Sequence, residues 1–357
     1  MIKNRVIIKV GTNVLTNDSD ELDYNVINSL TEQISSLKKK DFQVVLVASG
    51  AVAAGKKVLP QNNVKDHITK RQIFAAVGQI PLNQALTTSF EKNKITSAQV
   101  LLTRNIFVTR DNYDKIINVL DGLLTQEVVP IINENDVVSL NELSFGDNDA
   151  LAASLSIMLD AEKLLILSNI DGLYDRDPEE KESQLISEVN NIDRAINKMC
   201  SEKTSRSGLG GMLSKVKSIR LATRAGVESF IIRGKKEEVI TKTVQGHNQG
   251  TRFTQQKNVK LDARDRWLLI AQDKTARLQV DDGAREALKK RKSLLAVGIV
   301  SIHGNFEPNT IVEIVDKQKE LIGYGLTIYS SKELQEALTK KKRLAKYVIH
   351  ADNLTTI

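Results

Sequence analysis

Continuous apolar stretches alternate with amphipathic stretches up to about residue 235. The apolar runs that we expect to form strands are 5–10, 43–47, 99–102, 128–132, 163–167 and 229–232. The stretches with helical spacing are 25–40, 69–90, 112–126, 148–159 and 212–224, and Pro81 is expected to interrupt the second. Strands that are apolar along their whole length are typical of parallel sheets covered on both faces. The pattern therefore predicts an α/β fold, a three-layer sandwich around a mainly parallel open sheet.

The pattern changes after Thr275. Short strand-like segments then lie between glycine, proline and charged turns, at 277–280, 296–301, 310–315 and 324–329, with one helix over 283–291. Residues 245–260 are polar and contain two glycines, which suits a linker. We therefore expect a larger α/β domain over 1–255, a linker over 256–274 and a small β-rich domain over 275–357.

The composition is that of an ordinary globular protein, with 41% hydrophobic and 27% charged residues among 357 positions. Cys200 is the one cysteine, so no internal disulfide forms, which is typical of a reducing compartment. The N-terminal apolar run 6–8 is too short for a signal peptide or a membrane span. We therefore expect a cytoplasmic protein with no membrane partner.

The net charge of +7 favours anionic ligands, which include both nucleic acids and small anionic substrates. Two basic runs, 289–292 and 340–343, invite an RNA-binding interpretation, although a solvated surface is the default for such runs. The four histidines are far apart and lack the spacing of metal ligands. We therefore expect no metal site built from side chains.

Two glycine turns, far apart in the sequence, each carry one lysine. The first follows an apolar strand and contains Lys9 and Gly11, whereas the second, at 208–215, precedes a helix and ends in Lys215. Backbone N–H groups in such turns can face an anion because glycine adds no side chain. Two lysine-bearing turns suit transfer of a phosphoryl group between two anions, where positioning and charge stabilisation supply most of the catalysis.

Polar and glycine-containing clusters follow several of the predicted strands. They lie at 49–50, 133–136 and 168–169, and open parallel sheets bind ligands at these strand ends. A further cluster, Gly146-Asp147-Asn148-Asp149, precedes a helix. A helix cap needs only one such residue, so the excess indicates a pocket for an ammonium group or a carboxylate that positions a lysine.

The segment from Gly50 to Lys56 resembles the start of a P-loop. Lys57, however, stands where a P-loop has the hydroxyl group that binds Mg²⁺. The first glycine also follows its strand too closely to leave a wrapping loop. We therefore reject a P-loop NTPase.

Five motifs occur in the order seen in the glutamate 5-kinases of the amino acid kinase superfamily, a family that the chain resembles over essentially its whole length. They are Ile8-Lys9-Val10-Gly11-Thr12, Ala48-Ser49-Gly50-Ala51, Ile132-Asn133-Glu134-Asn135-Asp136, Gly146-Asp147-Asn148-Asp149 and Gly210-Gly211-Met212. The segments 280–284 and 304–306 are similar to the PUA domain of bacterial members. The resemblance implies the amino acid kinase fold followed by a PUA domain.

The resemblance also implies a reaction: phosphorylation of the γ-carboxylate of L-glutamate by ATP with Mg²⁺, the first step of proline biosynthesis. Feedback inhibition by proline and a homo-oligomer, either a dimer or a tetramer, are further implications. The nucleophile would be the substrate's own carboxylate, which is ionised at neutral pH, so no general base is needed.

The motifs carry the family's functional residues onto positions of this chain. The catalytic residues implied are Lys9, Lys215 and Asp149, with the aspartate holding both lysines in place. The substrate-binding residues implied are Ser49, Gly50, Asn133, Asp136, Asp147 and Asn148. The nucleotide-binding residues implied are Lys9, Gly11, Ser168, Asn169, Gly210, Gly211, Met212 and Lys215.

Two departures from the family pattern concern the nucleotide side. Ser168-Asn169 stands where the family often has Thr-Asp, and the loop at 208–211 is compressed. Nucleotide affinity and preference therefore do not follow from the resemblance. Two rival hypotheses are a kinase of the same superfamily acting on another acid, and an RNA-binding protein acting through its PUA domain. Intact Lys9, Lys215 and Asp149 argue against a vestigial kinase site, and RNA binding stays a secondary hypothesis.

Overall fold

The structure is a computed structural model that describes residues 4–61, 63–139, 148–201, 211–257, 259, 261–271, 275–340, 344 and 346–356. The chain divides into two compact units. The first consists of Met1–Ile106 and Asp111–Val259, and the second of Phe107–Arg110 and Lys260–Ile357. None of the helices in these ranges is both long enough and apolar enough to cross a membrane.

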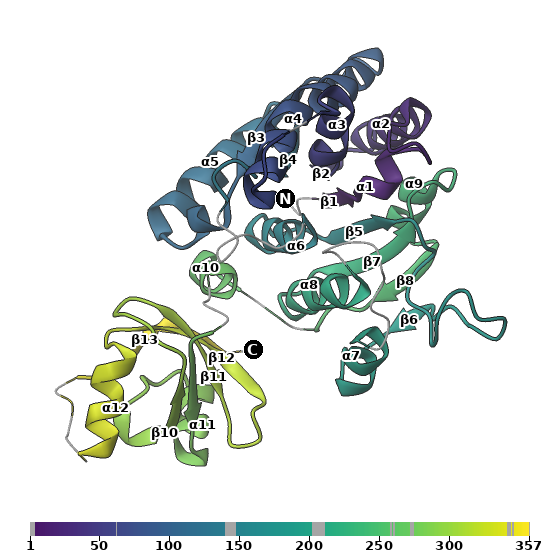
Figure 1. Cartoon of the computed structure of the whole chain (residues 1–357). Helices are drawn as coiled ribbons and strands as arrows, with labels where there is room; N and C mark the ends of the chain where they lie inside the picture. The colour runs from purple at the N-terminus through teal and green to yellow at the C-terminus, as the bar shows by residue number, and fades with distance from the viewer. Residues whose placement is uncertain are drawn as a thin grey trace. The chain divides into compact units, whose positions relative to one another are not determined.

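An eight-stranded sheet forms the centre of the first unit, in the order β3-β4-β2-β1-β5-β7-β8-β6 (Figure 1). Its strands are β1 Arg5–Val10, β2 Gln43–Ala48, β3 Ser97–Leu102, β4 Val129–Glu134, β5 Lys163–Ser168, β6 Glu188–Val189, β7 Glu228–Arg233 and β8 Gly250–Phe253. All neighbouring strands are parallel except β7 and β8. The expected α/β fold with a mainly parallel sheet is therefore confirmed.

Helices cover both faces of this sheet and complete the three layers (Figure 1). The helices of this part of the chain are α1 Thr12–Leu15, α2 Tyr24–Lys38, α3 Ala51–Val58, α4 His67–Lys92, α5 Arg110–Thr125, α6 Asn148–Met158, α7 Arg194–Ser201, α8 Met212–Arg224, α9 Val239–Val244 and the 3-10 helix η1 Arg104–Phe107. On one face α2, α4 and α9 bury apolar side chains against the central strands. On the other face α6 packs on β1 and β5, and α8 on β7. The starts of α6 and α8 are thereby fixed relative to the sheet.

Two glycines let α3 and α4 cross closely. A Cβ built on Gly78 would lie 1.8 Å from the carbonyl oxygen of Ala51, and one built on Gly55 would lie 1.8 Å from that of Phe74. Any larger residue at either position would push the helices apart. Gly55 therefore serves helix packing, and a phosphate loop is absent from this described segment.

Helix α4 continues through Pro81, so the expected interruption there is wrong. Proline removes one backbone hydrogen bond from a helix interior. Burial of Leu82, Leu86 and Phe90 in the core of the first unit stabilises this part of α4 against that loss.

The second unit is built on a five-stranded sheet in the order β10-β9-β11-β12-β13. Its strands are β9 Arg277–Val280, β10 Ile299–His303, β11 Ile311–Val315, β12 Leu321–Thr327 and β13 Ile349–Thr356. Its helices are α10 Ala263–Ala271, α11 Asp282–Lys289, α12 Ser331–Thr339 and the 3-10 helix η2 Ala296–Gly298. The sheet has an apolar core of its own, so the expected small β-rich domain is confirmed.

The segment 256–274, expected as a linker, contains helix α10. The apolar residues Trp267–Ile270 are consecutive rather than spaced at helical intervals, and all four are buried. Such a run has no helical period for a sequence pattern to detect. The indole N–H of Trp267 donates a hydrogen bond to the carbonyl oxygen of Phe107 at 3.0 Å, within the second unit.

Candidate active site

Lys9 and Gly11 lie where β1 ends, in the middle of the large sheet. Every residue of β1 is buried, and the side chain of Lys9 is 6% exposed. The N–H of Gly11 donates to the carbonyl oxygen of Leu167 on β5, which ties the turn to the neighbouring strand. A shielded ammonium group therefore stands at the carboxyl edge of the sheet, where such folds bind ligands.

Asp149 lies in the first turn of α6 and is completely buried. Its Oδ1 is 2.7 Å from Nζ of Lys9, and its Oδ2 is 2.9 Å from Nζ of Lys215. Lys215 belongs to the first turn of α8, whose N-cap is Gly211. The structure thus brings together the three residues that were expected to be catalytic.

The two lysines determine the ionisation of Asp149. Burial alone would raise the pKa of its carboxyl group, but the charges of Lys9 and Lys215 and their hydrogen bonds outweigh burial and lower that pKa below its ordinary value. Asp149 is therefore ionised at neutral pH. Two ammonium groups and one carboxylate leave a local excess of positive charge, which attracts an anion.

Hydrogen bonds join three of the residues expected to bind substrate. Nδ2 of Asn148, the first residue of α6, lies 2.9 Å from Oγ of Ser49 and 2.8 Å from Oδ1 of Asn133. Gly50, next to Ser49, has a φ of 111°, a left-handed conformation that favours glycine. The ends of β2 and β4 and the start of α6 are therefore linked through their side chains.

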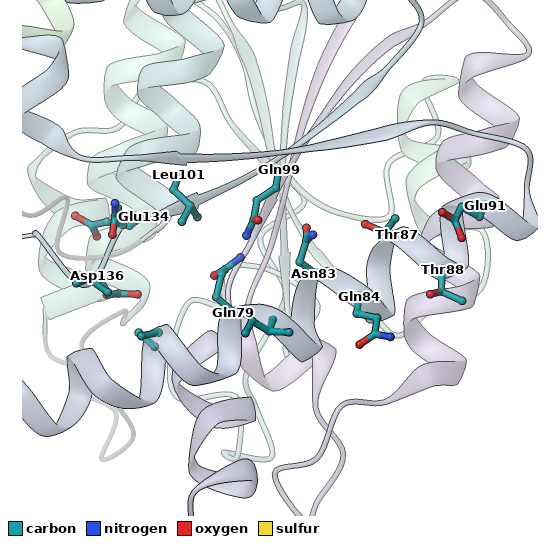
Figure 2. A pocket seen from close by; sticks show the side chains of 15 residues that line it. Gln79, Asn83, Gln84, Thr87, Thr88, Glu91, Gln99, Leu101, Glu134 and Asp136 are labelled. Carbon is teal, nitrogen blue, oxygen red and sulfur yellow. The ribbon is translucent and has the colours of Figure 1, made fainter.

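Asp136 lines a cleft of about 640 Å³ between α4 and the ends of β3 and β4 (Figure 2). Amide, hydroxyl and carboxylate side chains make up much of the lining, among them Gln79 and Glu134. Burial raises the pKa of Asp136, the guanidinium of Arg71 at 3.9 Å opposes that rise, and the carboxylate of Glu134 adds to it. The acidic end of this cleft suits a cationic group such as an ammonium.

Besides Lys9 and Gly11, the expected nucleotide residues that the structure describes lie at the end of β5 and at the start of α8. Ser168 is buried, and its carbonyl oxygen accepts a hydrogen bond from the N–H of Gly234 at 2.9 Å. Asn169 follows directly, and Met212 is the first residue of α8. A Cβ on Gly234 would lie 2.6 Å from the side chain of Val14, so the chain passes close to α1 here.

Sequence reasoning missed two features of this edge. Gln79 accepts a hydrogen bond at 2.8 Å from Nδ2 of Asn133, which is 54 positions away. Asp171 forms ion pairs with Arg233 and Lys236 beyond the ends of β5 and β7, and the hydrogen bond from Lys236 lowers its pKa. The sequence did contain a signal for the second feature. Asp171 follows β5, and Arg233 and Lys236 lie at and just after the end of β7, the parallel neighbour of β5.

Two expected site residues, Asp147 and Gly210, lie outside the described residues. Within the described ranges no three His, Cys, Asp or Glu side chains gather in a way that could hold a metal ion. Both oxygens of Asp149 are engaged by lysines.

Two family profiles match the chain, one in each part of it. The profile of the amino acid kinase family matches residues 4–234, and that of the PUA domain matches residues 276–349. A glutamate 5-kinase from Dehalococcoides mccartyi (strain CBDB1) is 37% identical over 337 residues, which cover 93% of this chain and 90% of the relative. Another, from Aliivibrio salmonicida (strain LFI1238), is 37% identical over 363 residues, covering 99% and 98%.

Solved structures share the fold at low identity. Carbamate kinase from Giardia lamblia bound to AMP-PNP matches with a TM-score of 0.54 and 16% identity, over 71% of this chain and 99% of its own. An isopentenyl phosphate kinase matches with a TM-score of 0.50 and 18% identity, over 70% and 100%. Identities in this range carry the fold alone.

Proposed function

The chain belongs to the amino acid kinase family and, within it, to the glutamate 5-kinases, and from this membership we propose which of its residues carry out the reaction. The protein transfers a phosphoryl group from ATP to L-glutamate, a step of proline biosynthesis. The proposed catalytic residues are Lys9, Lys215 and Asp149. The observation that carries this assignment is the buried carboxylate of Asp149 between two ammonium groups.

In the proposed reaction an oxygen of the substrate's γ-carboxylate attacks the γ-phosphorus of ATP. An oxygen–phosphorus bond forms, the bond from phosphorus to the bridging oxygen breaks, and ADP leaves with that electron pair. Negative charge spreads over the three equatorial oxygens of the transferring group. Lys9 and Lys215 stabilise this charge, and Asp149 fixes both ammonium groups before the reaction begins.

For glutamate we propose contacts from Ser49, Gly50, Asn133, Asp136, Asp147 and Asn148. The hydrogen bonds among Ser49, Asn133 and Asn148 support a preformed site at the strand ends. The carboxylate of Asp136 suits the substrate's α-ammonium group, because the acidic end of the cleft favours a cation.

For ATP we propose contacts from Lys9, Gly11, Ser168, Asn169, Gly210, Gly211, Met212 and Lys215. Gly211 caps α8, and the free N–H groups at the start of a helix favour phosphate. We propose Mg²⁺ as the accompanying ion; bound to the phosphates, it would neutralise part of their charge.

We propose proline as an inhibitor that occupies the glutamate site, because both molecules carry a positively charged α-nitrogen and an α-carboxylate. A homo-oligomer, a dimer or a tetramer, is supported by exposed apolar residues such as Ile80 and Val137, which line the same cleft as residues of the edge strand β3. A cytoplasmic location is supported by the single cysteine. RNA binding by the PUA domain stays a secondary hypothesis, supported by the exposed run Lys289–Lys292.

Replacing Asp149 by asparagine tests the catalytic assignment. The amide keeps the size of the carboxylate but lacks the charge that orders Lys9 and Lys215. We expect Asp149→Asn to lower kcat by about a hundredfold or more, the scale for losing one preorganised charge contact in a transition state. Glutamate-dependent ADP release gives kcat, and a melting curve reports folding.

The matched control is Asp23→Asn. Asp23 also stands at a helix start, where it accepts hydrogen bonds from the N–H groups of Asn25 and Val26. Asparagine caps helices as well as aspartate does, so this variant should keep wild-type turnover. A folded Asp149→Asn protein with near wild-type kcat would remove Asp149 from the mechanism.

A further inference from the structure

Three amide side chains run in a line from the cleft to the proposed glutamate site. Gln79 on α4 accepts at Oε1 from Nδ2 of Asn133 on β4, at 2.8 Å. Oδ1 of Asn133 accepts in turn from Nδ2 of Asn148, the first residue of α6, also at 2.8 Å. Gln79 rises from α4 into the cleft (Figure 2), so the line begins at a surface and ends at the start of α6.

One backbone group determines the direction of this line. The N–H of Glu134 donates to a side-chain atom of Asn133 at 2.9 Å, and a backbone N–H can only donate. That atom must therefore be the carbonyl oxygen of Asn133, and its NH₂ group must face Gln79. Gln79 then has to offer its own oxygen, and Asn148 has to offer its NH₂ group to Asn133.

The direction has a consequence at Asn148. Its NH₂ group faces Asn133, Ser49 at 2.9 Å and the carbonyl oxygen of Ala48 at 3.2 Å. Its Oδ1 is buried and accepts no hydrogen bond within the described part of the chain. A buried acceptor without a donor is costly, so this oxygen calls for a donor from a ligand. At neutral pH glutamate has one donor group, its α-ammonium, since both carboxylates only accept.

The backbone at the other end of the line packs closely against α3. Gly78 precedes Gln79, and a Cβ there would lie 1.8 Å from the carbonyl oxygen of Ala51 and 2.3 Å from the N of Gly55. Ala51 begins α3, directly after Ser49 and Gly50. The close crossing of α3 and α4 therefore brings Gln79 near the strand end that carries Ser49.

We propose that Gln79 is a positioning residue for substrate recognition. Acting through Asn133, it keeps the carbonyl oxygen of Asn148 turned toward the α-ammonium group of the amino-acid substrate. This inference rests on the proposed role of Asn148 in glutamate binding. Gln79 itself touches neither substrate nor nucleotide, and its contribution lies in the orientation of the amides.

Variants of Gln79 that change its hydrogen-bonding polarity test the proposal. Gln79→Glu keeps an acceptor, Gln79→Leu removes it, and Gln79→Lys replaces it with a donor. Two quantities are measured: the KM for glutamate, and the inhibition constant of glutarate, which competes for the site but has no α-ammonium group. Melting curves and the KM for ATP monitor folding and the nucleotide side.

We expect Gln79→Glu to keep the wild-type KM for the substrate glutamate. The leucine variant should raise the KM for glutamate about tenfold, the effect of one hydrogen bond, with kcat and the KM for ATP little changed. Gln79→Lys should raise the KM for glutamate further, because the lysine ammonium and Nδ2 of Asn133 are both donors and cannot hydrogen-bond to each other. The inhibition constant of glutarate should stay constant, since glutarate offers no donor to Asn148.

Gln84→Leu is the matched control, because Gln84 lies on the same helix with its side chain turned away from β3 (Figure 2); its KM should stay at the wild-type value. Equal KM values for glutamate in Gln79→Glu and Gln79→Lys would overturn the proposal. This comparison holds even if Gln79→Leu unfolds. A rise in the glutarate constant equal to the rise in KM would also overturn it. Asn148→Ala separates the proposed role of Asn148 from that of Gln79. An unchanged KM for glutamate in this variant refutes the role of Asn148 in glutamate binding. A raised KM in Asn148→Ala, together with equal KM values in the Gln79 variants, refutes only the positioning role of Gln79.

Discussion

Among single residues, Asp136 is where substrate binding should depend on pH. Burial raises its pKa, Arg71 opposes the rise and Glu134 adds to it. The ionised carboxylate attracts the substrate's α-ammonium group and the protonated form does not, so the KM for glutamate should rise as the pH falls through this raised pKa. We expect Asp136→Asn to raise the KM at neutral pH, to remove this pH dependence and to weaken inhibition by proline. Initial rates measured as the pH is lowered from neutral, with and without proline, check all three effects.

Arg71→Gln tests the sign of this prediction. The guanidinium of Arg71 lies 3.9 Å from Asp136 and lowers its pKa, so its removal should move the inflection of KM to higher pH. An Asp136→Asn variant that keeps the wild-type pH profile and the wild-type response to proline would contradict the assigned role.

Sequence motifs located Lys9, Lys215 and Asp149 because each stands beside glycines or at a helix start near a strand end. Gln79 has no such marker. It sits in the middle of α4, and its partner Asn133 is 54 positions away. A hydrogen bond between distant side chains leaves no local pattern, so only the folded chain shows it.

At the level of elements, the crossing of α3 and α4 should be the part of the fold most sensitive to a single methyl group. A Cβ on Gly78 would meet the carbonyl oxygen of Ala51 at 1.8 Å, and backbone cannot yield as a side chain can. We expect Gly78→Ala to destabilise the protein by about 1–3 kcal/mol, the usual cost of overpacking. Denaturant unfolding measures the change.

Gly122→Ala on α5 is the matched control, since a Cβ there meets nothing within 4 Å. It should stabilise the protein by about 0.5–1 kcal/mol, because alanine loses less backbone entropy in a helix. A Gly78→Ala protein as stable as the Gly122→Ala protein would show that the two helices are free to separate.

The elements that could be predicted from sequence are those in which burial follows one regular pattern along the whole element. The buried strands β1, β2 and β5 are continuous apolar runs, and α2 repeats its apolar residues at helical spacing. Helix α10 has a consecutive apolar run instead, because it is covered on several sides within the second unit. The prediction that Pro81 interrupts its helix was wrong because burial of apolar side chains stabilises α4 by more than the one lost hydrogen bond costs.

For the whole molecule, we expect a chain ending at residue 259 to keep glutamate kinase turnover. Every residue in the proposed machinery lies at or before Lys215, within the first unit. The same deletion removes Trp267, whose indole N–H donates a hydrogen bond to the carbonyl oxygen of the buried residue Phe107. The truncated protein should therefore melt at a lower temperature and aggregate more readily. Turnover, melting curves and light scattering separate these effects.

The full-length variant Trp267→Ala separates loss of the contact from loss of the domain. It should reproduce much of the fall in melting temperature while every β-strand of the second unit stays in place. A truncated protein that is folded, remains in solution and has no kinase activity would show that the second unit completes the active site.

The hydrogen bond between Trp267 and Phe107 joins positions 160 residues apart. At a synthesis rate of roughly 5–20 residues per second, the indole leaves the ribosome about 10–30 seconds after the carbonyl that it will meet. During this interval the large sheet can assemble, because β1 to β8 are all made before α10. The segment Phe107–Arg110, however, belongs to the unit that residues 260–357 complete, so it lacks these partners until they are made. Between η1 and α5 the growing polypeptide therefore carries a short segment whose partners in the fold are the last part of the chain to be made.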